Sequence, residues 1–314
     1  MKRFAVVGHG SFSWEQQWKY LSENFDFYYL QDEKFDYLKD YEAILIFAGG
    51  AYIKKTKLIR EAAPKAKILF NLDDDMMWDT GAVAHYDKPL QYYYNVIFPY
   101  IDGYIRNSVR QWSLPVPDFY FAIPRKMPKI EPMEKKEYVG VMHHFMSYPR
   151  SQIEAITRAG FKAKIFSGMM HTKPAQVEGY LRCCGVSDDL MRQHILMNHM
   201  GGPEYLRELT ECRYCIEDPE NYYGFSRFTC ESAMMNIPVI GNRFIQAMVI
   251  AFPELITNPQ DQNAQIALLK RLQSEPEFYN KLAVLGAERS IQDSCEETIT
   301  AYLLRAMRAV GVNV

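Results

Sequence analysis

The residues best suited to chemistry stand together in residues 220–242, which read ENYYGFSRFTCESAMMNIPVIGN. The middle of this stretch predicts a loop followed by a helix, with Ser226 as the N-cap residue and residues 228–235 as the helix. The start of a helix presents unpaired N–H groups and the positive end of the helix dipole, and both attract phosphate. Arg227 adds a fork of donors there, and Glu231, about one turn further along, is suited to accept hydrogen bonds from a pair of sugar hydroxyls. The stretch therefore predicts a site for a nucleotide diphosphate.

Short apolar runs flank this stretch and predict the strands that position it. Residues 213–218 (RYCIED) and residues 237–240 (IPVI) have the composition of strands buried in a parallel sheet. A loop and helix between two such strands lie where open α/β sheets bind their ligands.

The run GFSRFTCESAMMNIPVIGN resembles the carboxyl-terminal signature of glycosyltransferases with the GT-B architecture, in particular the group-one and family-four retaining enzymes. Gly224 and Phe225 match the first part of that signature, and residues 238–240 match its closing strand. Glu231 matches the second glutamate of the family. The resemblance implies that Glu231 binds the donor ribose, and that Gly224 and Phe225 belong to the donor site.

Two positions depart from the family signature. Tyr223 stands where the family has its first glutamate, close to the donor sugar, and Asn236 replaces a glycine. We therefore treat Tyr223 as a candidate catalytic residue. A GT-B fold that binds nucleotide sugars without transferring them would also lack this glutamate, so a binding module remains an alternative, as does a nucleotide-sugar epimerase of the same architecture.

Two further loops contribute candidates for the donor phosphates. In family-four enzymes an arginine and a lysine hold the donor diphosphate on the loop that follows the first strand of the second domain. Arg150 falls near the lysine position and His143 near the arginine position. Gly10 follows the first strand of the chain, in a loop that the resemblance implies faces the cleft between the domains.

Three adjacent carboxylates follow another predicted strand, in residues 71–79 (NLDDDMMWD). In one interpretation Asp73 and Asp75 hold a divalent cation against the donor, as in the metal-dependent GT-A glycosyltransferases. In the other, Asp73, Asp74 or Asp75 orients the acceptor or acts as a base in a GT-B cleft. A solvated loop that caps a helix is the plain alternative.

The predicted elements alternate between strands and helices along the chain. Regular β-α alternation predicts parallel sheets covered by helices. The predicted fold class is α/β, with two Rossmann-like domains in the GT-B architecture facing a central cleft. We expect an acceptor domain over residues 1–130, a donor domain over residues 131–290, and a terminal helix over residues 291–314 that crosses back to the first domain. The proline-rich residues 115–132 are the expected linker.

Composition excludes several other classes of protein. A net charge of −2 over 314 residues offers no basic platform for nucleic acid. No apolar window is long enough to span a membrane, and the first apolar run is too short for a signal peptide. The six cysteines are typical of reduced thiols in a cytoplasmic protein.

A zinc site at His194, His199, Cys212 and Cys215 is disfavoured. The predicted strand turns the two cysteines to opposite faces of the sheet, and the two histidines diverge on an expected helix.

Together these features predict an enzyme that moves a sugar from a nucleotide diphosphate donor to an unidentified acceptor, with retention and with no cofactor or essential metal. The acceptor could be a glycan, a small molecule or a modified nucleic acid.

Overall fold

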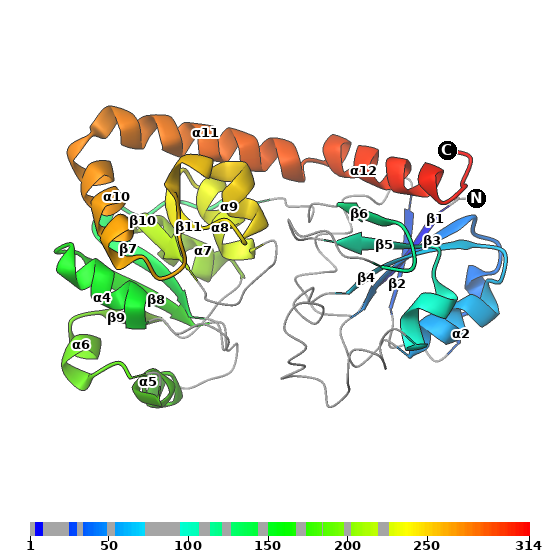
Figure 1. The fold of residues 1–314 in the computed structure, drawn as a ribbon, viewed down its shortest axis with the longest axis horizontal. Coiled ribbons are helices and arrows are strands. Elements are labelled where there is room, and N and C mark those ends of the chain that lie inside the picture. The colour runs from blue at the N-terminus through cyan, green and yellow to red at the C-terminus, as the bar shows by residue number, and fades with distance from the viewer. Residues whose placement is uncertain are drawn as a thin grey trace. The chain divides into compact units, whose positions relative to one another are not determined.

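A computed structural model describes residues 4–8, 25–29, 34–48, 54–72, 95–106, 114–120, 127–143, 150–167, 174–183, 185–197, 202–218 and 226–314. The chain divides into two compact units. Unit 1 comprises Met1–Lys126 and Asp293–Val314, and unit 2 comprises Met127–Gln292. Within the described residues, each unit contains one sheet of six strands, and all pairs of neighbouring strands are parallel. Figure 1 shows the two sheets and the helices of each unit.

The sheet of unit 1 has the strand order β2-β1-β3-β4-β5-β6. Its strands are β1 (Phe4–Gly8), β2 (Phe25–Tyr29), β3 (Ala43–Ala48), β4 (Lys67–Leu72), β5 (Gly103–Arg106) and β6 (Asp118–Tyr120). The helices described in this unit are α2 (Lys55–Ala62), α12 (Glu296–Ala309) and two short 3-10 helices, η2 (Asp36–Leu38) and η5 (Phe98–Tyr100). The strand order reverses between β1 and β3, because β2 lies on one side of β1 and every later strand lies on the other.

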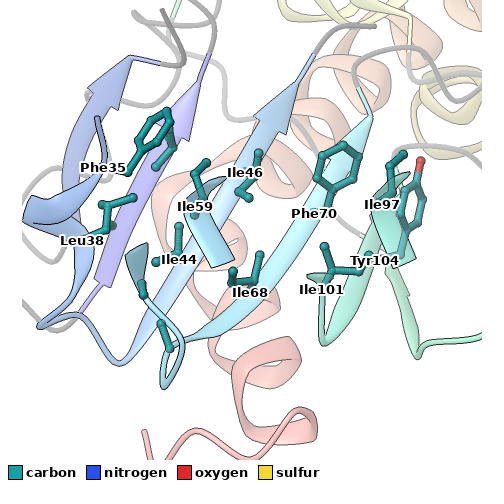
Figure 2. Packing of buried hydrophobic residues seen from close by; sticks show 14 of the residues in the cluster. Phe35, Leu38, Ile44, Ile46, Ile59, Ile68, Phe70, Ile97, Ile101 and Tyr104 are labelled. Atoms are coloured by element: carbon teal, nitrogen blue, oxygen red, sulfur yellow. The ribbon is translucent and has the colours of Figure 1, made fainter. Parts of the chain in front are cut away.

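The core of unit 1 forms because its central strands are almost wholly apolar. The side chains of Ile44 and Ile46 on β3, and of Ile68 and Phe70 on β4, are fully buried. Figure 2 shows them in one cluster with Ile59 of α2, which covers this face of the sheet. Strands that are buried on both faces read as continuous apolar runs, and this explains the sequence AILIFA of β3.

The carboxyl-terminal segment packs within unit 1. The ring of Tyr302 on α12 meets the ring of Tyr120 on β6 edge to face, with centroids 5.5 Å apart. The hydroxyl groups of Tyr120 and Tyr302 both donate to Asp293, over 3.2 and 3.3 Å. Gly103 of β5 is adjacent to Val310, whose Cγ1 would lie 3.1 Å from a Cβ at position 103.

The sheet of unit 2 has the strand order β12-β11-β10-β7-β8-β9. Its strands are β7 (Lys136–His143), β8 (Lys162–Ser167), β9 (Ile195–Met197), β10 (Cys212–Glu217), β11 (Val239–Asn242) and β12 (Ile256–Thr257). The order reverses between β7 and β10: β8 and β9 extend the sheet to one side, and β11 and β12 extend it to the other.

The helices that connect the strands of unit 2 are α4 (Arg150–Arg158), α5 (Pro174–Cys183), α6 (Asp188–Arg192), α7 (Gly202–Thr210), α8 (Arg227–Met234), α9 (Gln246–Ala251) and the 3-10 helix η6 (Pro253–Leu255). Helices α10 (Gln262–Ser274) and α11 (Pro276–Ser294) follow the last strand, and the final two residues of α11 belong to unit 1. Within the described part of the chain, no helix combines the length and the apolar character needed to span a bilayer.

The predicted fold class is confirmed, since the chain forms two parallel sheets connected by helices. Two local predictions differ from the structure. The expected linker over residues 115–132 does contain the boundary between the units, at Lys126 and Met127, but it also contains strand β6. This strand is tolerated beside prolines because it lies at the edge of its sheet. Residues 195–197 were expected to be helical, yet they form the short edge strand β9.

Candidate functional site

The candidate site lies at the carboxyl ends of β7 and β10 in unit 2. These two strands are neighbours and run parallel, so their carboxyl ends meet at the same edge of the sheet. They also flank the point at which the strand order reverses. Open α/β sheets bind ligands in the crevice outside the strand ends at such a point. Helix α4 follows β7, and helix α8 follows β10, so both helices begin at this edge (Figure 1).

The start of α8 is capped by Ser226, as predicted. The Oγ of Ser226 accepts a hydrogen bond from the backbone N–H of Thr229 over 3.1 Å. The helix begins at Arg227, one residue earlier than expected. Ser226 has a positive φ of 58° with ψ of 106°, a region that residues other than glycine rarely occupy. Backbone strain of this kind concentrates at ligand sites, where the surrounding contacts enforce it.

The contacts that hold Ser226 come from Glu217, the last residue of β10. Its Oε2 accepts hydrogen bonds from the hydroxyl groups of Ser226 and Thr229, each over 2.5 Å. Burial raises the pKa of the Glu217 carboxyl above its ordinary value, although the two hydroxyl groups oppose the shift. Glu217 is not among the residues predicted for the site. The only signal was an acidic residue at the end of an otherwise buried strand.

Arg227 and Glu231 lie on the same face of α8. The Nε of Arg227 is 3.4 Å from the Oε1 of Glu231, as expected for residues four apart on a helix. Glu231 is only 5% exposed, whereas the Arg227 side chain is partly accessible. The structure therefore brings together three of the predicted donor-site residues, Ser226, Arg227 and Glu231, within the first two turns of one helix.

A tyrosine from the neighbouring helix α7 lies beside this pair. Tyr205 is fully buried, and its hydroxyl oxygen makes no hydrogen bond to a described residue. Burial raises the pKa of Tyr205 well above its ordinary value; the charge of Glu231 adds to the shift and the charge of Arg227 opposes it. Sequence reasoning missed Tyr205, because it lies in a segment with no motif.

Asp218, which directly follows β10, forms hydrogen bonds to the end of β11, to the backbone at Gln260 and to α10. Its carboxylate accepts hydrogen bonds from Asn242 Nδ2 at the end of β11, over 2.9 Å, and from the backbone N–H of Gln260, over 2.7 Å. It also accepts from Gln265 Nε2 of α10 over 2.6 Å. Burial raises the pKa of Asp218, and these three donors oppose the shift. Asp218 thus fixes the ends of β10 and β11 relative to the start of α10.

Two predicted donor-site residues belong to the β7–α4 connection. Arg150 is the first residue of α4, where its Nε lies 2.7 Å from Glu154 Oε1. Its Nη1 would lie 3.1 Å from a Cβ at Gly185, so the guanidinium covers that glycine. Among the described residues, the hydrogen bond and ion pair of Arg150 go to Glu154 and not to α8. His143 ends β7, and its side chain lies outside the described part of the structure.

The remaining predicted site residues also lie outside the described residues. They are Gly10, Asp73, Asp74, Asp75, Tyr223, Gly224 and Phe225.

The cysteine pair that could have indicated zinc is arranged differently from the prediction. Cys212 and Cys215 were expected to face opposite sides of the sheet, which is wrong. An irregularity in the pairing of β10 with β7, between Cys212 and Tyr214, shifts the alternation of side chains. Both sulfur atoms consequently lie near Gly140, at 3.3 and 2.8 Å from the position of a Cβ there. Both thiols are buried, and burial raises the pKa of each.

His194 has a structural role. Its Nδ1 accepts a hydrogen bond from the backbone N–H of Ala163 over 3.0 Å, and its Nε2 lies 3.1 Å from Thr157 Oγ1. Burial, assisted by the charge of Lys162, lowers the pKa of His194 to about 4. Both ring nitrogens are therefore occupied by protein groups. Among the described residues, no group of three or more His, Cys, Asp or Glu side chains is placed to hold a metal ion.

Comparisons with known proteins find similarity only at the level of structure. No family model matches the sequence, and no curated protein matches it. Sucrose-phosphate synthase from Thermosynechococcus elongatus superposes with a TM-score of 0.72 at 13% identity, covering 99% of each chain. HepE from Anabaena, solved with UDP and glucose, gives a TM-score of 0.66 at 9% identity over 98% of this chain and 100% of its own.

A trehalose-phosphate synthase from Burkholderia xenovorans, solved with glucose-6-phosphate, gives a TM-score of 0.63 at 10% identity, covering 98% of this chain and 100% of its own. The chain has the GT-B fold. The GT-A alternative is therefore wrong about the fold. At these identities the superpositions establish the fold and leave the reaction to be argued from the site.

Proposed function

We propose that this protein transfers a sugar from a nucleoside diphosphate donor to an acceptor, and that unit 2 binds the donor. One observation carries this proposal. At the reversal point of the unit 2 sheet, a helix begins with an arginine at its first position and a buried glutamate four residues later. The GT-B fold supports the same conclusion.

Each residue at this helix start has a role that follows from its chemistry. The diphosphate is the leaving group, so stabilising its developing charge is the main requirement for transfer. The N–H groups in the first turn of α8 and the Arg227 guanidinium supply positive potential at one place. Glu231 accepts hydrogen bonds from the ribose hydroxyls. Arg150 and His143, from the adjacent strand–helix connection, complete the donor site in this proposal.

Unit 1 is proposed to bind the acceptor. Asp73 and Asp75 are the candidates there, because they follow strand β4 along the chain, and open α/β sheets bind ligands beyond the carboxyl ends of their strands. Gly10, which follows strand β1, remains a candidate for contact with the donor phosphates. A neighbour solved with glucose-6-phosphate supports including phosphorylated sugars among the acceptors to be tested. UDP-glucose is the first donor to test, since HepE was solved with UDP and glucose.

Retention of anomeric configuration and independence from metal are parts of the proposal that rest on the resemblance in residues 224–242. Product analysis by NMR with an α-configured donor tests retention, and an α-glycoside is expected. Full activity in excess chelator is expected as well. Loss of activity that Mn²⁺ or Mg²⁺ restores would contradict metal independence.

A thermal-shift screen with UDP, GDP, ADP, CDP and TDP tests the donor site. A ligand at one hundred times its Kd stabilises the folded state by about 2.7 kcal/mol, which is readily measured. We expect at least one nucleotide to shift the wild type, and Glu231→Ala to abolish that shift. Glu275→Ala is the matched control, because Glu275 is an exposed carboxylate at the end of α10, paired with Arg271. No shift with any nucleotide would contradict the proposal.

A binding module without transferase activity is the second candidate function. Tyr223 supports it, since this tyrosine occupies the position of the family's first glutamate. The two functions differ in turnover, so hydrolysis of a bound sugar nucleotide in the absence of acceptor separates them. Release of free sugar above the uncatalysed rate supports the transferase. Nucleotide binding without any release of sugar supports the binding module.

A further inference from the structure

Three hydrogen bonds close a ring beneath the first turn of α8. The hydroxyl groups of Ser226 and Thr229 both donate to Glu217 Oε2, and the N–H of Thr229 donates to Ser226 Oγ. All three residues are buried, with exposed fractions of 6% for Glu217, 3% for Ser226 and 0% for Thr229. The strand end, the cap residue and the third residue of the helix are thereby fixed to one carboxyl oxygen.

This ring determines which donors the helix start can offer to an anion. The single hydroxyl hydrogen of Ser226 is committed to Glu217, and the Ser226 carbonyl already accepts the N–H of Cys230 over 3.3 Å. The Thr229 N–H is committed to Ser226. The N–H groups of Arg227 and Phe228 precede the first intrahelical hydrogen bond. Their direction follows from the orientation of the first turn, and Glu217 fixes that orientation.

The ring lies next to the remaining polar groups of the site. The Tyr205 hydroxyl is fully buried without a hydrogen bond to a described residue, and its charged neighbours are Glu231, Arg227 and Glu217. A buried hydroxyl without a partner costs stability and is uncommon in native proteins, so its position beside Glu231 indicates a place where a polar ligand is accommodated. The helix start that the ring holds in place therefore lies next to a second polar group, the buried Tyr205 hydroxyl.

We propose that Glu217 is a positioning residue of the donor site: it receives the hydroxyl groups of Ser226 and Thr229 and so holds the N–H groups of Arg227 and Phe228 in the orientation that binds a diphosphate. The assignment rests on the proposed function, because it concerns the same site. In this assignment Ser226 acts as the N-cap of the helix start, and its hydroxyl hydrogen is directed to Glu217 and not to the ligand.

The test compares three variants, each of which changes one chemical group of the hydrogen-bonded ring. Thr229→Val removes one hydroxyl donor and keeps the shape of the side chain, whereas Thr229→Ser keeps the hydroxyl and removes a methyl group. Glu217→Gln keeps an acceptor oxygen at the end of β10. Lys164→Met is the stability control. Its ammonium binds Glu211, which precedes β10, so it lies at the opposite end of the strand from Glu217.

The measurement is the Kd, by isothermal titration calorimetry, of whichever of UDP, GDP, ADP, CDP and TDP binds the wild type best. We expect Thr229→Val to weaken binding at least about fivefold, because one of the two hydroxyl groups that hold the turn is lost. Thr229→Ser and Glu217→Gln should bind more tightly than Thr229→Val, and Lys164→Met should bind like the wild type despite its lower stability.

The outcomes separate this assignment from the proposed function. A wild type that binds none of the five nucleotides overturns both. Binding by the wild type that Thr229→Val leaves unchanged overturns the role of Glu217 alone. The role is also overturned if Lys164→Met weakens binding as much as Thr229→Val does, because the effect would then follow stability, or if Thr229→Ser binds no better than Thr229→Val.

Discussion

Two replacements of Ser226 distinguish the contribution of its side-chain hydrogen bonds to stability from the cost of its positive φ. Ser226→Ala removes the cap and the hydrogen bond to Glu217 but keeps a Cβ at φ of 58°. Ser226→Gly removes the same two hydrogen bonds and also the Cβ. The difference between the two variants therefore reports the strain that the backbone holds at this residue.

The magnitudes follow from the contacts. Loss of a serine N-cap costs about 1 kcal/mol. Loss of a donor to the buried Glu217 carboxyl costs a further ~1–3 kcal/mol, because the acceptor stays buried. Ser226→Ala should therefore lower the free energy of unfolding by roughly 2–4 kcal/mol. Glycine relieves the positive φ, which costs other residues about 1 kcal/mol or more, so Ser226→Gly should be less destabilised by about that amount.

Ser187 provides the matched control. It caps α6 through a hydrogen bond from the N–H of Leu190, but with an ordinary φ of −71°, and it is exposed. The free energy of unfolding is measured for alanine and glycine variants at both positions by urea denaturation. The difference between glycine and alanine should be about 1 kcal/mol larger at position 226 than at position 187. If the difference in the free energy of unfolding between the glycine and alanine variants is the same at both positions, the backbone of Ser226 is not strained. If Ser226→Ala has the same free energy of unfolding as the wild type, the hydrogen bonds of Ser226 to Glu217 and Thr229 do not stabilise the protein.

Three further perturbations test individual contacts within unit 1 or within unit 2. Lys164 is buried and pairs with Glu208 and Glu211 over 2.6 and 2.7 Å, so Lys164→Met should lower the free energy of unfolding by about 3 kcal/mol, measured by urea denaturation. The folded-state pKa of Glu217 is raised, so its contribution to stability is full below the unfolded value of 4.5 and is lost as the pH rises through the folded value. The wild type should therefore lose stability relative to Glu217→Gln as the pH rises above 4.5, and a constant difference would contradict the shift. Asp293 accepts hydrogen bonds from two tyrosines, so Asp293→Ala should lower the melting temperature of unit 1, with an estimated loss of about 2 kcal/mol, and no change would contradict those bonds.

Much of the fold could be predicted from the sequence, because each central strand is a short apolar run between helical segments. Strands β10 and β11 begin and end within two residues of the expected ranges, 213–218 and 237–240. The edge strands β6 and β9 escaped prediction for physical reasons. Strand β6 lies among prolines, which usually indicate a linker, and β9 has only three residues, too few to show a period of two.

The sequence predicted those residues of the candidate site that lie close together along the chain. Ser226, Arg227 and Glu231 stand within one helical segment, so a cap, a cation and a carboxylate one turn apart could be read directly. Glu217 could not, because its partners lie nine and twelve residues away along the chain, and only the return of the chain onto the strand end brings them together.

Irregular strand pairing also left no sequence signal. Cys212 and Cys215 point to the same side because the register between β10 and β7 shifts between Cys212 and Tyr214. A prediction based on strict alternation of side chains therefore placed them on opposite faces of the sheet.

A crystal structure of the protein soaked with UDP or a UDP-sugar tests the central claim most directly. We expect electron density for the diphosphate at the N–H groups of Arg227 and Phe228, with the Arg227 guanidinium turned toward it and the ribose hydroxyls hydrogen-bonded to Glu231. A nucleotide bound elsewhere in unit 2, or in unit 1, would contradict it.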